Sequence, residues 1–404
     1  MMRARGGMTV TNGRVRTKES LRVLMLVSYP AIQGPIPKLA PLLVDQLRAL
    51  GCDIETEHWS RHTDHESLLE KIVGRARDLA RIQARLRRRR FDVMYITTAH
   101  TWAGLTRDIP LVLLTKRVCP HRVIMFHGSY SNHLNAPGHT LLKMASRVLV
   151  SACDAGLVLS QEEKGEWSAF YPAGRFEVVA NAFTPELLAT GQMVAGEVGA
   201  GNASACAGYR SGVPTLLFVG RLTPEKGILD LVRAVAVVNG TTPCRLLVAG
   251  DGPSASAVSH TADELGIAGN VGLLGFVSGP DLARCYEEAD ALVLPSYREG
   301  FPTVLLEAMS MGLPIVTTAL RGAVDRLEEG VNALFVPPRR PDLLAEALAR
   351  VLSDGHLRAS MAANNLAKIK EFAPEVVAPQ YLAILESVVS EHAAGPSTVV
   401  EGAP

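Results

Sequence analysis

Long apolar runs, paired cysteines and an excess of charge of one sign are all missing from this chain. Because no stretch of about 18 consecutive apolar residues occurs, the sequence argues against a membrane-spanning helix. The six cysteines are scattered without a C-x-x-C pair, so we expect a protein of the reducing cytoplasm. A formal net charge of +1 leaves no general basic field for nucleic acid.

Several short motifs of nucleotide and metal chemistry are also absent. The loops after the predicted strands contain neither G-x-G-x-x-G nor G-x-x-x-x-G-K-[ST], which argues against an NAD-dependent dehydrogenase and a P-loop kinase. No D-x-D pair of carboxylates occurs. His58, His62 and His65 lie near one another without a recognised ligand pattern, so no metal site is expected.

The chain does have a repeated alternation of short β-branched runs with longer helical patterns. The alternation predicts parallel sheets covered on both faces, and because it occurs twice we expect an α/β protein of two Rossmann-like domains facing a cleft. Strands are predicted at 21–28, 93–97, 123–127, 157–159, 215–220, 245–249, 271–274, 291–295 and 314–317, and the clearest helices of the first half at 39–50 and 68–90.

The domain boundaries follow from composition. A stretch rich in Gly, Ala and Ser connects the two halves, and a last helical pattern after Pro374 is expected to cross back to the first domain. The predicted parts are a loose tail at 1–20, a first domain at 21–184, a linker at 185–212, a second domain at 213–372, a crossover helix at 373–390 and a second tail at 391–404.

The most informative segment, 295–314, reads PSYREGFPTVLLEAMSMGLP. A strand ends here and a helix is predicted over 303–309, with Gly300 permitting a tight turn and Pro302 suited to the first helical turn. The free N–H groups of that turn and the positive end of the helix dipole would form an anion site at the carboxyl end of a strand.

Glu299 and Glu307 flank this turn. Carboxylates accept hydrogen bonds from hydroxyls, so a ligand with both a phosphate and sugar hydroxyls would satisfy the whole segment. The alternatives are that Glu299 caps the helix and that Glu307 is an ordinary solvated helix residue.

Two further post-strand loops carry suitable groups. In FVGRLTPEKG, Arg221 and Lys226 supply enough positive charge to balance a pyrophosphate, although Lys226 could instead form a surface pair with Glu225 or Asp230. In AGDGP, at 249–253, two glycines would let a ligand approach the backbone, or the loop is simply a turn.

In this order and spacing, the three segments resemble the donor domain of the retaining glycosyltransferases of family 4, which have the GT-B fold. The E-x7-E pattern of Glu299 and Glu307 is that family's hallmark. The resemblance covers most of 213–372 strongly and the first half more loosely. It implies an enzyme that moves a hexosyl group from a nucleotide diphosphate sugar to a hydroxyl acceptor (a glycan, a lipid-linked compound or a small molecule), with no metal or other cofactor.

The resemblance also implies roles for individual residues. Arg221 and Lys226 would hold the donor diphosphate, Glu299 and the backbone after it the donor sugar, and Glu307 the ribose. The other implied donor-binding positions are Gly220, Gly250, Asp251, Gly252, Gly300, Phe301, Pro302, Thr303 and Val304.

In the first half, His127 follows a strand and resembles the family's cleft histidine, which faces the donor sugar. Without the resemblance it would be read as a hydrogen-bonded structural residue. Asn181 and Gly34 are the implied acceptor-side positions, but Pro35 stands where a second glycine is common, and it removes a backbone donor. Asp325 is the nearest counterpart of a family glutamate and receives no role.

A basic stretch from Arg75 to Arg90 contains eight arginines and only Asp78 against them. It suggests peripheral attraction to an anionic membrane or to a lipid-linked acceptor. The alternative is a solvated helix that precedes a buried strand.

Two rival functions remain open on the sequence alone. One is a nucleotide-sugar epimerase of the same fold, which would isomerise its donor without an acceptor. The other is a protein that binds sugar nucleotides without catalysis, which the presence of both cations and both glutamates disfavours.

Overall fold

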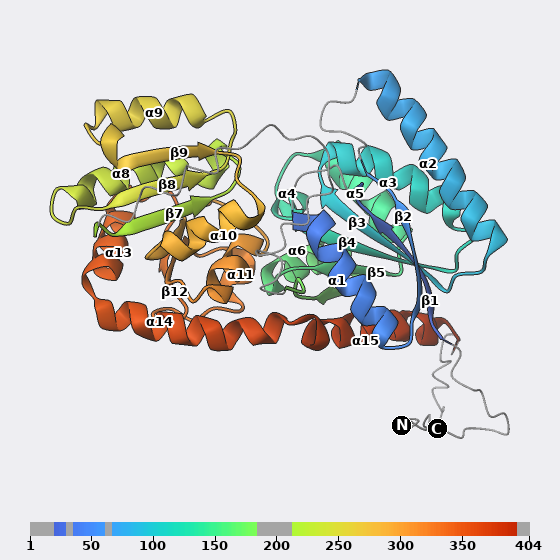
Figure 1. Ribbon diagram of the computed structural model, residues 1–404. Coiled ribbons are helices and arrows are strands. Elements are labelled where there is room, and N and C mark those ends of the chain that lie inside the picture. The colour runs from blue at the N-terminus through green and yellow to red at the C-terminus, as the bar shows by residue number, and fades with distance from the viewer. Residues whose placement is uncertain (1–19, 30–34, 61–66, 184–211, 394–404) are drawn as a thin grey trace, which may run out of the picture.

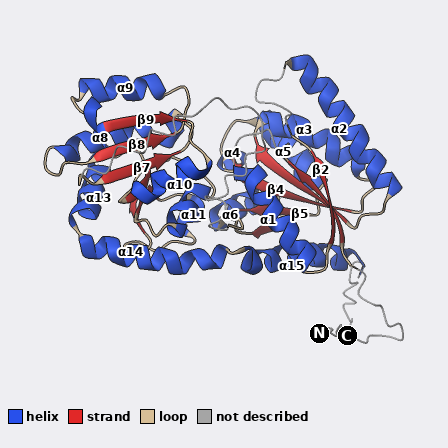
Figure 2. Cartoon of the chain, in the orientation of Figure 1, coloured by secondary structure: helices blue, strands red, loops and turns tan. Residues whose placement is uncertain are grey.

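A computed structural model describes residues 20–29, 35–60, 67–183 and 212–393. Two six-stranded sheets form its centre, each with strands paired in parallel. Their orders are β2-β1-β3-β4-β5-β6 and β12-β11-β10-β7-β8-β9. Figure 1 shows the two sheets in separate domains with helices around both, and Figure 2 shows the same layers by secondary structure. The predicted fold class is confirmed.

Most elements of the first domain alternate between strand and helix, as a parallel sheet requires. In chain order they are β1 (Arg22–Val27), α1 (Pro35–Ala49), β2 (Asp53–His58), α2 (Leu68–Arg88), β3 (Val93–His100), α3 (Trp102–Thr115), β4 (His121–Ser129), α4 (Asn132–Asn135), α5 (Thr140–Ser151), β5 (Ala155–Val158), α6 (Gln161–Phe170) and β6 (Phe176–Val178).

The second domain repeats the alternation. Its elements are β7 (Thr215–Val219), η1 (Pro224–Lys226), α8 (Ile228–Asn239), β8 (Arg245–Ala249), α9 (Ala255–Glu264), η2 (Ala268–Asn270), β9 (Val271–Gly275), α10 (Gly279–Glu288), β10 (Ala291–Leu294), α11 (Thr303–Ser310), β11 (Ile315–Thr318), α12 (Arg321–Val324), β12 (Ala333–Val336), α13 (Pro341–Ser353), α14 (Gly355–Lys368), η3 (Ile369–Phe372) and α15 (Pro374–Ala393).

Alternating side chains of the first sheet build two separate cores. Val23 and Met25 of β1 pack in one core with side chains of α1 and α15. Leu24 and Leu26 point the other way, into a core shared with α2, α3, α5 and α6. The period of two along a strand therefore explains why the sheet needs helices on both faces.

Three strands were missed, and one helix begins elsewhere than predicted. The strand β2 was missed because its sequence, DIETEH, gives no apolar run, and the short edge strands β6 and β12 were missed as well. Helix α1 begins earlier than predicted, at Pro35, where a residue without an N–H suits the first helical position.

The last helix, α15, crosses back to the first domain as predicted. The hydroxyl of Tyr381 donates to the carbonyl of Ala180 at 3.0 Å, and the Gln46 amide of α1 donates to Glu375 at 3.2 Å. Figure 1 shows α14 and α15 running along the base of both domains. The helix extends beyond residue 390, to Ala393. Most of the predicted tails and linker lies outside the described residues, so those boundaries stay predictions.

Two glycines let the loops after β7 and β8 pack backbone against backbone. A Cβ on Gly250 would lie 1.9 Å from the carbonyl oxygen of Gly220, and one on Gly252 would lie 2.4 Å from that of Leu222. Both approaches are far closer than any Cβ contact allows. The AGDGP loop is therefore more than a simple turn, because its glycines fix where the two loops sit.

We expect Gly250→Ala to lower the free energy of unfolding by about 1–3 kcal/mol, since the loops must separate to admit the methyl group. Urea unfolding followed by circular dichroism measures the change. Gly269→Ala is the matched control, because a Cβ at that position meets nothing within 4 Å. Equal stability of the two variants would contradict the close approach.

Candidate functional site

The segment after β10 forms an open helix start. Helix α11 begins at Thr303, and Pro302 occupies the N-cap with an extended backbone and no side-chain capping bond. The predicted helix is confirmed, but Pro302 lies one position before the first helical turn. Among the described residues, no side chain competes for the first N–H groups of α11, so this helix start can meet an anion.

Gly300 serves close packing more than a tight turn. Its φ is not among the positive values, but a Cβ there would lie 3.1 Å from the Leu159 side chain and 3.6 Å from the Cα of Gly128. Both neighbours belong to the first domain. The chain bends at Gly300 without needing a positive φ, and the small size of this residue brings the loop after β10 against the loop after β4.

Glu299 and Lys226 meet directly. Lys226 Nζ lies 2.7 Å from Glu299 Oε2, with the two side chains 26% and 17% exposed. The other carboxylate oxygen of Glu299, Oε1, is buried and accepts no hydrogen bond from the described part of the chain. The alternative pairings of Lys226 with Glu225 or Asp230 are therefore wrong, and Glu299 does not cap α11.

The loops after β7 and β10 pack against each other through their backbones. Gly227 has a φ of +66°, and a Cβ there would lie 2.2 Å from the Pro295 carbonyl oxygen. The N–H of Tyr297 donates to the carbonyl of Glu225 at 2.7 Å. Arg221, in the first of these loops, is exposed and forms no ion pair within the described residues. The structure thus brings Lys226 to Glu299, and it places the loop that carries Arg221 against the loop that carries Glu299.

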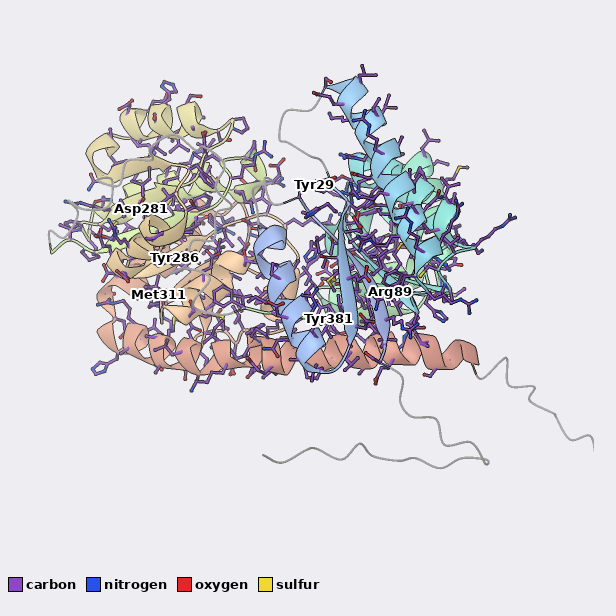
Figure 3. The ribbon with its side chains drawn as sticks, turned by 45° about the vertical axis from the view of Figure 1, so that its right-hand side comes forward. Tyr29, Arg89, Asp281, Tyr286, Met311 and Tyr381 are labelled. Carbon is purple, nitrogen blue, oxygen red and sulfur yellow. The ribbon has the colours of Figure 1, made fainter. Side chains whose placement is uncertain are left out.

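Glu307 is held by a tyrosine that the sequence did not single out. The hydroxyl of Tyr286, on α10, donates to Glu307 Oε2 at 2.6 Å. Burial, with the nearby carboxylate of Glu307, raises the pKa of Tyr286 well above its ordinary value, so the hydroxyl keeps its proton and remains a donor. Figure 3 labels Tyr286 in the second domain. Glu307 is half-buried, so it is not an ordinary solvated residue.

The side chains of Phe301 and Asp251 are both engaged in contacts within the protein. Phe301 is buried and stacks on Phe372 with ring centroids 5.4 Å apart, so only its backbone can reach a ligand. Asp251 accepts a hydrogen bond from the N–H of Gly252 at 2.7 Å. Their predicted donor contacts stay predictions.

On the first-domain side, His127 lies near the end of β4 and shares a small cavity with Asn181, Tyr95 and Tyr381. Burial lowers the pKa of His127 to about 4, so its ring is neutral at neutral pH. Asn181 is buried. The structure therefore brings together two of the three first-domain residues that were predicted, while Gly34 lies outside the described residues.

Three arginines of the second domain contact the first domain directly, and the sequence prediction missed all of them. Arg298 donates to the carbonyl of Ser129 at 2.7 Å and also contacts Asn132. Arg321 donates to the Ser131 hydroxyl at 3.1 Å and pairs with Glu166 at 2.9 Å. These contacts hold the end of β4 in place.

The third arginine, Arg326, donates to two first-domain carbonyls, those of Leu159 at 2.7 Å and Val179 at 2.8 Å. Beside it, Asp325 accepts a hydrogen bond from the N–H of Gln161 at 2.6 Å. In the sequence, Asp325 was noted only as the nearest counterpart of a family glutamate, without a role. Asp325 thus joins the two domains.

The arginine-rich stretch is partly neutralised. Arg81 pairs with Glu57 at 2.8 Å, Arg85 with Glu55 at 2.5 Å, and Arg89 contacts both Asp53 and Glu55 of the same strand, β2. These three arginines are therefore used in ion pairs within the first domain. His58 stacks on Tyr29 with centroids 4.7 Å apart, while His62 and His65 lie outside the described residues.

The family described as "Glycosyl transferases group 1" matches residues 207–368, the span that contains the donor-side loops. This part of the chain thus matches a glycosyltransferase family, which agrees with the predicted enzyme class and its nucleotide-sugar donors.

Curated relatives share parts of the chain. A D-inositol 3-phosphate glycosyltransferase of Corynebacterium glutamicum is 27% identical over 75% of this chain and 74% of its own. An α-D-kanosaminyltransferase of Streptomyces kanamyceticus is 33% identical over 37% of this chain and 39% of its own. A glycosyltransferase of Methanocaldococcus jannaschii is 39% identical over 35% of this chain, and the match spans only 37% of that relative.

Solved structures share the fold at low identity. A sucrose-phosphate synthase from Thermosynechococcus elongatus has a TM-score of 0.73 at 18% identity and covers 92% of this chain and all of that one. Anabaena HepE in complex with UDP-glucose has a TM-score of 0.66 at 18% identity, over 91% of this chain and all of its own. Within the described ranges, no group of three His, Cys, Asp or Glu side chains is placed to hold a metal.

The lowered pKa of His127 makes a pH-dependent contribution to stability. Because the unfolded chain takes up a proton near pH 6.5 and the folded chain only near pH 4, this contribution is complete above pH 6.5 and is lost as the pH falls towards 4. We expect His127→Gln to remove it, which flattens the pH dependence of the unfolding free energy by at most about 3 kcal/mol.

Urea unfolding of the wild type and His127→Gln across this pH range measures the difference. His260→Gln, which replaces an exposed histidine of α9, is the control and should follow the wild type. Parallel pH curves for the wild type and His127→Gln would show that the histidine is not held neutral by burial.

Proposed function

We propose that this protein transfers a hexosyl group from a nucleoside diphosphate sugar to a hydroxyl acceptor in the cleft, with retention of anomeric configuration and without a metal. The bond from the anomeric carbon to the diphosphate breaks, a bond to the acceptor oxygen forms, and the nucleoside diphosphate leaves together with the proton of the acceptor hydroxyl. The observation that carries this proposal is the environment of Glu299.

Glu299 presents a buried acceptor that the described part of the chain leaves unsatisfied. Burying a carboxylate oxygen without a hydrogen bond is costly, so such an atom marks a place where a ligand donor fits. The neighbouring Lys226 fixes the carboxylate and keeps two further N–H donors, because an ammonium has three. A sugar hydroxyl at Oε1 and a phosphate at Lys226 would satisfy both groups with one ligand.

Charge on the departing diphosphate is the main energetic problem of the reaction. Arg221, Lys226 and the uncapped start of α11 would stabilise that charge by their fixed positions, without proton transfer. Glu307, oriented by Tyr286, would accept hydrogen bonds from the ribose. His127, neutral and across the cleft, would face the donor sugar.

The names of the relatives guide the choice of substrates. HepE was crystallised with UDP-glucose, and several relatives act on inositol 3-phosphate, so UDP-glucose and a small phosphorylated polyol belong in the first screen. Thermal stabilisation by UDP-, GDP-, ADP- and dTDP-sugars, with and without EDTA, identifies the donor. A hundredfold excess over Kd stabilises by about 2.7 kcal/mol.

The same incubations separate the rival functions. Retained configuration of the product, followed by NMR, supports the proposal, and turnover that survives EDTA supports independence from metal. Isomerised donor sugar in the absence of acceptor would favour an epimerase. Binding of a donor with no transfer to any acceptor would favour a protein that only binds sugar nucleotides.

Lys226→Ala should lower kcat by about a hundredfold, because removing one charged donor from a phosphate site costs ~3 kcal/mol of transition-state stabilisation. Steady-state kinetics with the donor found in the screen measure the loss, and circular dichroism checks the fold. Arg233→Ala removes a cation that pairs with Asp230 on α8, and it should leave kcat unchanged. Unchanged kinetics of Lys226→Ala would remove that residue from the site.

A cytoplasmic location, based on the scattered cysteines, also belongs to this proposal. So does peripheral contact of the stretch from Arg75 to Arg90 with an anionic membrane. No helix in the described part of the chain combines the length and apolarity that a bilayer crossing would need.

A further inference from the structure

Three neighbouring helices of the first domain turn large apolar side chains to solvent. On α5, Leu141, Met144 and Val148 recur at helical spacing on the outward side, and Leu141 is 71% exposed. The inward side of the same helix packs Leu142 and Leu149 into the core. The helix is therefore apolar on both sides, which burial against its own sheet does not explain.

The two adjacent helices repeat the pattern. Helix α3, which packs against α5, exposes Trp102, Leu113 and Leu114. Helix α2, next to α3, exposes Leu69 and Ile72 near its start. We call the outward sides of α2, α3 and α5 the docking face. Apolar side chains exposed on three neighbouring helices of one domain indicate an interaction surface.

The charges of the docking face have one sign. Of the acids on these three helices, Asp78 and Asp108 are buried, and Glu70 alone is exposed. Exposed basic residues are present at Lys71, Arg77, Arg87, Arg88, Lys116 and Arg117. The imbalance is local, because the whole chain carries a formal net charge of only +1. Apolar side chains among cations, with almost no acid, complement an anionic lipid surface.

The topology places one end of the docking face beside the cleft. Along the chain, each of the helices α2, α3 and α5 connects two parallel strands of the first sheet. Each helix therefore begins at the edge of the sheet where the strands end. The same edge carries Gly128, which lies against Gly300 of the second domain. Leu69, Trp102 and Leu141, at the three helix starts, therefore lie on the cleft side of the docking face.

We propose that the outward faces of α2, α3 and α5 form one surface that docks on an anionic bilayer and holds the cleft at the membrane. The surface is larger than the arginine-rich helix and depends on apolar insertion as much as on charge. A lipid-linked acceptor could then enter the cleft from the bilayer. The inference does not depend on the donor chemistry, because membrane binding is measured without donor or acceptor.

The experiment uses the full chain and vesicles of phosphatidylcholine alone or mixed with phosphatidylglycerol. We expect co-sedimentation with the mixed vesicles that weakens as salt rises. Trp102 supplies an internal probe, since it is 52% exposed while Trp59 and Trp167 are buried. Its fluorescence should shift to shorter wavelength on binding, and Trp102→Phe should abolish the shift.

Two pairs of variants separate apolar from electrostatic contact. Leu141→Ser with Met144→Ser should weaken vesicle binding about tenfold, whereas Val237→Ser with Val376→Ser, which changes exposed valines elsewhere, should not. Arg87→Glu with Arg88→Glu should weaken it at least about tenfold. Arg284→Glu with Arg350→Glu makes the same change of net charge on the second domain and should have a much smaller effect.

Three results would overturn the proposal. They are no binding to anionic vesicles, equal losses from the docking-face variants and their controls, or a stable dimer that Leu141→Ser with Met144→Ser converts to a monomer. The last result would assign the docking face to a second copy of the chain. All of these variants alter exposed side chains, so circular dichroism should show an unchanged fold.

Discussion

The cleft depends on one close approach between the two domains. Gly300 lies so close to the first domain that an added Cβ would crowd the Leu159 side chain and touch Gly128, and the approach brings the loop after β10 against the end of β4. His127 and Glu299 lie next to these glycines in the sequence. A reaction that joins a donor held by one domain to an acceptor held by the other needs such a fixed distance.

Hydrogen bonds from charged side chains beside this contact hold the two domains in a fixed relative position. Arg321 and Arg326 of the second domain donate to first-domain oxygens, and Asp325 receives a bond in return. Carbonyl acceptors do not change charge with pH, so the two bonds from Arg326 persist wherever the fold does. The segment from Arg321 to Arg326, which contains α12, thus joins the two domains.

Local patterns were enough to predict the fold class and the donor-side loops. The strand-to-helix segments carry their own signals, so Lys226, Glu299 and Glu307 were found from sequence. Their partners were not, because the pairing of Lys226 with Glu299 and of Tyr286 with Glu307 arises only when distant loops pack. The strand β2 was missed because DIETEH has no apolar run, and the arginines of α2 that pair with its acids come close only in the folded domain.

The docking face, too, could be predicted from the sequence only in part. The arginines from Arg75 to Arg90 were conspicuous in sequence, yet Arg81, Arg85 and Arg89 are used within the domain. The apolar side chains that remain exposed were hidden among ordinary helical patterns. Only the packing of each helix tells which of its two apolar sides is covered.

The path of α15 has a consequence for synthesis on the ribosome. One face of the first sheet is covered partly by Tyr381 and its neighbours, which are translated after the whole second domain. The first domain can collapse early around the core that Leu24 and Leu26 share with α2 and α3. The core on the other face of the sheet is complete only after α15 has been translated. During translation that uncovered face would be the natural place for a chaperone to bind.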